Sequence, residues 1–449
     1  MEAKKEIFSG KQLRQLILPL IMEQVLGITV GLADSIMVSS AGEAAVSGVS
    51  LVDSINILLV NLFCSLSTGG AVAAAHHLGE NQREKAVKTA DQLLLCVTGI
   101  SLAVALISIA GNRAILRAVF GSVEQDVMLN AVIYFYITAV SFPFLGIYNA
   151  SSALSRAMGN SRVTMYISVL TNIVNIAGNA VFILVFHAGV YGVAISTLIS
   201  RIVGAVIMYV ILRDSKKPIH LSGTLRVRFS PEIVRRIMKV GIPTGMDNCI
   251  FQIGKILVQS LVAGLGTTAI TANAIAGVMA GIAVIPASAI GIAMITVVGQ
   301  TAGAAALDET VRYVKKLMLY AYIGMVGLNL LMIVSARCIV GLYAVTPEAA
   351  DMAVRVVIFH SVCAMLLWPT GFALPNAMRA VFDANYTMIV SVVSMWVFRI
   401  GMSYLFVLYF DLGLLGVWAA MGVDWLFRSA CFVRRVKSGR WLGHLGKNM

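Results

Sequence analysis

Charged residues are scarce in this chain. Of its 449 residues only 12% are Asp, Glu, Lys or Arg, whereas 59% are hydrophobic. Soluble domains average about a quarter charged and half apolar. Proline is also rare, with 9 residues against 39 glycines, which suits helices that pack closely through small residues better than a barrel of short alternating strands. The composition therefore predicts an all-α integral membrane protein.

Sequence motifs for catalysis and cofactor binding are missing as well. The sequence contains no Gly-x-x-x-x-Gly-Lys, no His-Glu-x-x-His and no Gly-x-Ser-x-Gly, which argues against ATP hydrolysis, zinc-protease and serine-hydrolase chemistry. The six cysteines fall within apolar runs without Cys-x-x-Cys spacing, so neither a disulfide framework nor a zinc site is indicated. We expect no enzyme activity and no bound cofactor.

Long hydrophobic runs fill most of the chain. A bilayer core requires about 20 apolar residues for each helix that crosses it. On this measure we place twelve spans near residues 13–40, 46–77, 89–111, 128–152, 163–186, 190–212, 240–264, 268–298, 314–336, 352–377, 386–410 and 412–433.

Basic residues gather on one side of these predicted spans. With both termini on the same side, the termini and the loops of that side hold 26 of the 34 Lys and Arg residues. The positive-inside rule therefore predicts cytoplasmic termini in a bacterial inner membrane, and it explains the net charge of +13 without nucleic acid. The one long polar connection is strongly basic, so we divide the chain into an N-lobe (1–213, helices 1–6), a cytoplasmic linker (214–239) and a C-lobe (240–449, helices 7–12).

The two lobes repeat one another. At an offset of 224 positions, Pro19 to Gln24 matches Pro243 to Asn248, and Gly42 matches Gly266. At an offset of 223, Arg156 to Met165 matches Arg379 to Met388. Six helices per copy give both copies the same orientation, as in parallel repeats. We expect substrate to bind between them.

A few polar side chains lie at membrane depth, where an ionisable group is expensive unless it faces a cavity or a partner. Glu23 and Asp34 are eleven residues apart, so they share a helix face. Apolar neighbours disfavour a charged Asp34, which makes it a candidate for reversible protonation; the alternative is a carboxylate that caps or hydrogen-bonds a neighbouring helix.

The fifth predicted span carries Asn172, Asn175 and Asn179 on one face. These amides either line a site or join helices by hydrogen bonds. Four further residues are candidates to complete a polar pocket in this lobe: Asp53, Asn56, Ser196 and Thr197.

The C-lobe differs in the sign of its charges. Its first span sets Asn248, Gln252, Lys255 and Gln259 on one face, and Arg399 is a second cation at membrane depth. The spacing of Asp424 and Arg428 predicts an ion pair within one helix. Asp247, the repeat counterpart of Glu23, is a candidate to neutralise Lys255 or Arg399.

These residues carry a family resemblance. The stretch from Pro19 to Val38, the loop from Arg156 to Met165 and the segment from Val174 to Asn179 resemble the multidrug and toxic compound extrusion (MATE) family, in particular the branch of the DNA-damage-inducible F protein. The resemblance implies a V-shaped transporter of two six-helix lobes. Such transporters export amphipathic organic compounds from the cell by alternating access, in exchange for H⁺ or Na⁺.

The resemblance also implies individual roles. Asp34 matches the acid that takes the coupling ion, including Na⁺, and Pro19 matches the proline at which that helix bends. Asn175 and Thr197 match further coupling-site positions, whereas Asn179 stands where the family usually has Asp, and Glu23 or Asp53 is a candidate to replace its charge. We assign Asp53, Asp247, Asn248, Gln252, Lys255 and Arg399 to the substrate cavity, and we expect a monomer.

Two other functions remain open at this point. A flippase for lipid-linked precursors, from the same superfamily, would use buried Lys and Arg to hold pyrophosphate. A membrane-embedded enzyme would require clustered His or Asp motifs at the interface, which we do not find in the sequence.

Overall fold

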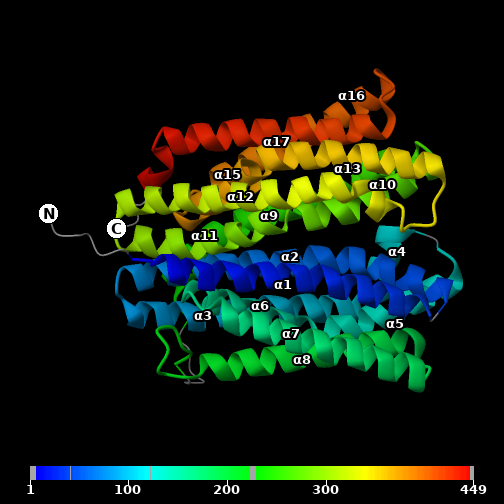
Figure 1. Ribbon diagram of the computed structural model, residues 1–449. Helices are drawn as coiled ribbons and strands as arrows, with labels where there is room; N and C mark the ends of the chain where they lie inside the picture. Colours follow the sequence, from blue (N-terminus) through cyan, green and yellow to red (C-terminus); the bar gives the residue numbers. More distant parts are fainter. Residues whose placement is uncertain (1–6, 41, 122, 223–228, 445–449) are drawn as a thin grey trace. The chain divides into compact units, whose positions relative to one another are not determined.

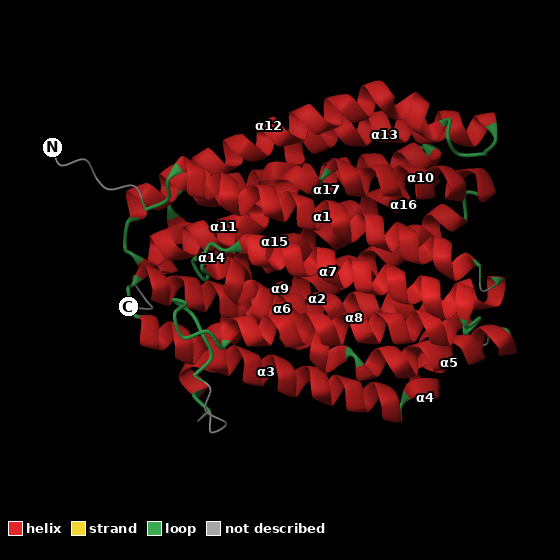
Figure 2. Cartoon of the chain, turned by 60° about the horizontal axis from the view of Figure 1, so that its bottom comes forward, coloured by secondary structure: helices red, strands yellow, loops and turns green. Residues whose placement is uncertain are grey.

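The fold was analysed in a computed structural model that describes residues 7–40, 42–121, 123–222 and 229–444. All regular structure in these ranges is helical (Figure 2). The chain divides into two compact units, Phe8–Gly245 and Met246–Met449, with Met1–Ile7 grouped with the second. We call the two long segments the N-half and the C-half (Figure 1).

In the N-half, α1 packs mainly against α7, and α2 packs against α3, α5 and α6. Its helices are α1 (Gly10–Ser39), α2 (Glu43–Gly79), α3 (Arg83–Ala110), α4 (Asn112–Phe120), α5 (Gln125–Val140), α6 (Phe142–Ala157), α7 (Ser161–Asn179), the π-helix η1 (Ala180–Val185) and α8 (Gly189–Leu212).

The C-half is reached through α9 (Pro231–Ala263), and the boundary between the two units falls inside this helix. Its remaining helices are α10 (Thr267–Ala283), α11 (Ile285–Gly303), α12 (Leu307–Val340), α13 (Pro347–Trp368), the π-helix η2 (Pro369–Ala373), α14 (Leu374–Ala380), α15 (Ala384–Val393), the π-helix η3 (Ser394–Gly401), α16 (Met402–Leu408), α17 (Gly413–Lys437) and the short 3₁₀-helix η4 (Arg440–His444).

The helix boundaries repeat at the offset found in the sequence. The helix α2 starts at Glu43 and ends at Gly79, and the pair α10 and α11 starts at Thr267 and ends at Gly303, each 224 positions later. Residues with positive φ recur at equivalent turns: Gly42 and Gly266, Asn81 and Ala305, His187 and Asp411, Gly189 and Gly413. The predicted duplication is confirmed.

Length and composition alone recover fewer membrane spans than the expected twelve. Among the residues that the structure describes, nine helices are long and apolar enough to cross a membrane, and α5 with α6, bent by 48°, would make ten. Two expected spans are not recovered, and both correspond to helices with charged residues: α9 carries Lys239, Asp247 and Lys255, and α17 carries Asp424 and Arg428. These charged side chains lower the mean hydropathy of α9 and α17, so hydropathy does not recognise either helix as a membrane span. The helix α9 also begins at Pro231, inside the segment expected to be a linker.

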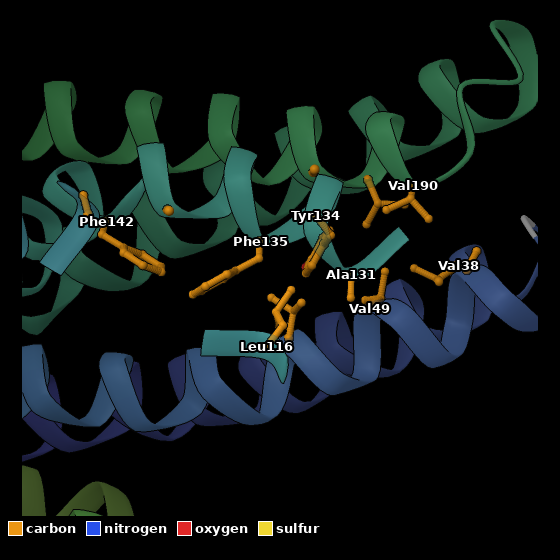
Figure 3. Close-up of a cluster of buried hydrophobic side chains, with 14 of the residues drawn as sticks. Val38, Val49, Leu116, Ala131, Tyr134, Phe135, Phe142 and Val190 are labelled. Carbon is orange, nitrogen blue, oxygen red and sulfur yellow. The ribbon is translucent and has the colours of Figure 1, made fainter. Parts of the chain in front are cut away.

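A cluster of buried apolar side chains packs α1 and α2 of the N-half against α3, α4, α5, α6 and α8 (Figure 3). Val38 of α1 and Val49 of α2 lie toward one end of the view, and Phe135 and Phe142 toward the other. Tyr134 of α5 belongs to this cluster and also lines the cavity described below. The apolar cluster thus fixes one wall of a polar site.

Pro19 lies inside α1, where it removes one backbone hydrogen bond. The carbonyl of Gln15, four residues earlier, would have accepted that bond. Ser161, the first residue of α7, donates its hydroxyl to the oxygens of Gln15 at 3.3 Å and of Leu16 at 2.6 Å. The disrupted turn of α1 is therefore satisfied by a neighbouring helix.

Candidate functional site: two cavities at membrane depth

The N-half encloses a cavity of about 360 Å³ between α1, α2, α5, α6, α7 and α8. Both apolar and polar residues line it. The polar ones are Asp34, Ser35, Ser50, Asp53, Tyr134, Tyr148, Thr171, Asn172, Asn175, Thr197, Ser200 and Arg201.

Asp34 is the first member of a chain of hydrogen bonds on one side of this cavity. The Nδ2 of Asn179 donates to Asp34 Oδ1 at 2.7 Å and to Asn175 Oδ1 at 3.4 Å, and Asn175 Nδ2 donates to Thr197 Oγ1 at 3.4 Å. The Oδ1 of Asn179 is buried and has no hydrogen-bond partner. The structure thus brings together four of the predicted site residues: Asp34, Asn175, Asn179 and Thr197.

Asp53 forms a second acidic position in the same cavity. It accepts hydrogen bonds from Asn56 Nδ2 at 3.3 Å and from the hydroxyl of Tyr134 at 3.4 Å. Arg201 of α8 interacts electrostatically with both Asp53 and Asp34, and its guanidinium donates to Ser141 Oγ at 2.6 Å. Two carboxylates therefore share one cation.

The helix backbone is irregular beside this hydrogen-bond chain. Asn179 is the last residue of α7, and the π-helix η1 starts at the next residue. Short π-helical segments are found frequently at functional sites. A close approach of α7 and α8 is also required here, because a Cβ on Gly178 would meet Ser196 Oγ at 2.9 Å.

The C-half encloses its own cavity of about 540 Å³. Lys255 and Arg399, both predicted for the substrate site, line it, and Lys255 is exposed on its wall rather than buried. The rest of the wall combines aromatic groups and amides: Phe251, Gln259, Asn273, His360, Trp368, Phe372, Trp418 and Trp425. Asn273 donates to Gln259 Oε1 at 2.9 Å and accepts from Trp418 Nε1 at 3.0 Å.

The predicted ion pair of α17 is present. Arg428 Nε donates to Asp424 Oδ1 at 2.8 Å, and both side chains are almost fully buried. Asp424 also accepts from the Ser394 hydroxyl, and the Arg428 guanidinium lies over the ring of Phe372 at 5.2 Å. Neither residue of this pair lines the cavity; the pair lies in the packed region beside it.

Glu23 and Asp247 do not line either cavity. Glu23 accepts from Arg156 at 3.3 Å and from Thr164 at 3.1 Å. Asp247 pairs with Arg379 at 2.7 Å, so the expectation that it neutralises Lys255 or Arg399 is wrong. The two pairs occupy equivalent places in the repeat: one joins α1 to the last turn of α6, and the other joins α9 to the last turn of α14.

Asn248 and Gln252 are likewise not among the described residues that line the C-half cavity. They share α9 with Lys255 and Gln259, which do line it. Sequence reasoning also missed several residues that form the cavities. Arg201 had a signal, because an arginine inside a predicted span requires a partner, whereas Tyr134 and the tryptophans resembled ordinary packing residues.

These features define a class of protein. Large apolar side chains such as Leu18, Ile36 and Leu331 remain exposed along the helices, which suits lipid contact. A duplicated helical chain, whose cavities between long apolar helices are lined by ionisable side chains, is built like a secondary transporter. The protein is a multi-pass membrane protein of that class.

Comparison with known proteins identifies the family. The MatE family model matches residues 19–181 and 243–405, one copy in each half and again 224 positions apart. The chain belongs to the MatE family of membrane transporters, and it is a transporter rather than an enzyme.

Relatives match over nearly the full length. The chain is 25% identical to an uncharacterized transporter, YisQ, of Bacillus subtilis, with 94% of this chain and 93% of the relative covered. It is 25% identical to the probable multidrug resistance protein NorM of Thermotoga maritima, with 96% and 93% covered. A crystal structure of MATE in the straight conformation shares the fold, with a TM-score of 0.89 at 20% identity and 97% of both chains covered.

Proposed function

We propose that this protein is a cation-coupled antiporter that exports small, amphipathic organic compounds across the bacterial inner membrane, with both termini in the cytoplasm. The coupling ion is H⁺ or Na⁺, and its site is Asp34. The names of relatives such as the NorM protein of Thermotoga maritima support multidrug export.

The observation that carries this proposal is the hydrogen-bond chain from Asp34 through Asn179 and Asn175 to Thr197. When Asp34 is charged, the amide of Asn179 stabilises it. When a proton or a Na⁺ ion arrives, the unpartnered Oδ1 of Asn179 offers an additional oxygen. Hard cations prefer such carboxylate and carbonyl oxygens. One side chain can therefore exist in both states that antiport requires.

Antiport further requires the ion and the substrate to favour different conformations, because a ligand shifts an equilibrium only through its differential affinity for the two states. Arg201 links Asp34 to Asp53 electrostatically. Neutralising Asp34 releases Arg201 toward Asp53 and so changes the interactions among α1, α2 and α8. The bend of α1 at Pro19 is the place where this helix adjusts, because its hydrogen bonds are already interrupted there. We propose that the two halves then alternate access to the cavities.

The proposal is tested with purified protein in proteoliposomes. An imposed H⁺ or Na⁺ gradient directed out of the vesicle is expected to drive uptake of a fluorescent organic substrate, and the opposite gradient is not. The ion whose gradient is effective is the coupling ion. Asp34→Asn is expected to abolish coupled transport while the protein still inserts and purifies as wild type. Asp351→Asn, an exposed acid on α13, serves as the matched control. Gradient-driven transport at wild-type rate in Asp34→Asn would refute the proposal.

A further inference from the structure

The C-half cavity has an excess of positive charge. Two carboxylates lie in its surroundings: Asp247 pairs with Arg379 at 2.7 Å, and Asp424 pairs with Arg428 at 2.8 Å and also attracts Arg399 electrostatically, so two acids face four cations. Lys255 and Arg399 line the cavity itself, and none of the described residues that line it is acidic. Lys255 and Arg399 also interact electrostatically with each other. Two like charges at one membrane-depth cavity are costly unless something negative joins them.

The hydrogen-bonding groups of this cavity point to the same ligand chemistry. The buried atoms Arg399 Nε, Arg399 Nη1 and Trp425 Nε1 have no hydrogen-bond partner. All three are donors. Leaving a buried donor unsatisfied costs the desolvation of that group, so the site is completed by a ligand that supplies acceptors. An oxyanion supplies several acceptors and a negative charge at once.

The shape and the walls of the cavity indicate the rest of the ligand. Trp368 stacks on Phe372 with ring centroids 4.9 Å apart, and His360 meets Trp418 and Trp425 edge to face at 5.5 and 5.4 Å. The volume of about 540 Å³ suits a drug-sized molecule. Flat apolar walls of this kind bind aromatic rings.

We infer that the C-half cavity binds aromatic organic anions, whose carboxylate, sulfonate or phosphate group is held by Lys255 and Arg399 and whose rings lie against the tryptophans. This assignment names a substrate class for the transporter and rests on the proposed export function. An anionic lipid headgroup presents the same oxyanion chemistry, so the test separates the two sources.

The test measures fluorescence polarisation of two related xanthene dyes, anionic fluorescein and cationic rhodamine 123, on purified full-length protein in detergent. Wild type is expected to bind fluorescein more tightly than rhodamine 123. Lys255→Gln and Arg399→Gln are each expected to weaken fluorescein binding by about tenfold or more, because a charged hydrogen bond is lost, and to leave rhodamine binding unchanged.

Matched controls remove the same charges elsewhere. Lys315→Gln on α12 and Arg355→Gln on α13 neutralise exposed cations that lie outside the cavity, and both are expected to bind fluorescein as wild type does. If Arg399→Gln fails to fold, Lys255→Gln decides, because its side chain is exposed. Equal fluorescein affinity in Lys255→Gln and wild type, or a wild type that binds only rhodamine, overturns the assignment.

Competition identifies the source of the anion. Displacement of fluorescein by short-chain phosphatidylglycerol, but not by short-chain phosphatidylcholine, assigns the site to an anionic headgroup; displacement by soluble aromatic carboxylates alone assigns it to a free anion. Both outcomes support an oxyanion site. Fluorescein binding through Lys255 without transport of either dye under any gradient would refute the proposed export and leave the site standing. Export of rhodamine without fluorescein binding would support the proposed export and refute the oxyanion site.

Discussion

The N-half and the C-half build a cavity from the same positions of the repeat but line it with opposite chemistry. At the offset of 224, Asp34 corresponds to Val258 and Gly31 to Lys255, and all four residues line their cavities. Other equivalent lining pairs are Ser35 and Gln259, Asp53 and Gly277, Thr197 and Met421, and Arg201 and Trp425. An acidic, amide-rich cavity thus has a basic, aromatic counterpart.

The difference shows what a duplication preserves. The two halves share helix boundaries and turns, which determine where a cavity forms between the helices. The side chains that line the cavity are not shared. We therefore expect the N-half cavity to serve the coupling ion and the C-half cavity to serve an organic ligand.

The strongest test of this comparison moves the carboxyl group from one half to the other. Asp34→Val with Val258→Asp keeps the number of acids but is expected to lose at least about 100-fold of gradient-driven transport, because a charge without its preorganised partners is not stabilised. At the offset of 223 found for the segment from Arg156 to Met165, the equivalents of Asn179 and Asn175 are Met402 and Phe398. Transport in proteoliposomes provides the measurement, with Val258→Asn alone as the control. Substantial recovery in the exchanged protein would mean that the two cavities are interchangeable.

The buried ion pair of α17 has no counterpart in the N-half, where Ser200 and Gly204 occupy the equivalent positions. Arg428→Leu removes the ion-pair partner of the buried Asp424 and leaves this acid with only the Ser394 hydroxyl and the electrostatic attraction of Arg399, so we expect a loss of about 3–5 kcal/mol in the free energy of unfolding. Thermal unfolding followed by tryptophan fluorescence measures the change. Adding Asp424→Leu is expected to restore most of the stability, and a double variant as unstable as the single one would contradict this reading.

The equivalent ion pairs at Glu23 and Asp247 allow a matched comparison. Asp247 lies 2.7 Å from Arg379 and is the more buried acid, whereas Glu23 lies 3.3 Å from Arg156. We expect Asp247→Asn to destabilise the protein by about 1–3 kcal/mol and Glu23→Gln by less, because solvent screens the more accessible pair. Apparent melting temperatures of the two variants give the order. The opposite order would show that distance and burial do not govern these pairs.

The smallest effect concerns one turn that both halves share. Asn81 has φ 57° and its equivalent Ala305 has φ 54°, a left-handed conformation that Asn tolerates better than Ala. We expect Ala305→Asn to gain up to about 1 kcal/mol and Asn81→Ala to lose a similar amount. Melting temperatures that shift in the same direction for both variants would exclude backbone strain as the cause.

Much of this arrangement could be predicted from the sequence. The repeat offset located equivalent helices, and rare polar residues within apolar runs located Asp34, Asn175, Asn179 and Thr197. The partner of Asp247 could not be predicted from local spacing, because Arg379 lies 132 residues away in the sequence. The repeat shows only that the pair of Glu23 with Arg156 and the pair of Asp247 with Arg379 are equivalent once one of them is known from the structure.

The number of membrane spans is harder to obtain from hydropathy, for a physical reason. Hydropathy recognises helices that lipid surrounds, whereas α9 and α17 carry the charged residues of the C-half site and its supporting ion pair. Contacts between distant helices, such as that of Arg201 with Asp53, leave no local signal in the sequence.

The left-handed turns of the two halves indicate a common origin. Where the N-half has Gly159 at φ 81°, the C-half has Phe382 at φ 64°, and His187 at φ 49° is matched by Asp411 at φ 50°. Residues of quite different chemistry have thus inherited one backbone conformation, even where glycine would adopt it more easily. The common origin of the two halves is therefore easier to trace through the spacing of these turns than through the side chains that line the cavities, which differ between the halves.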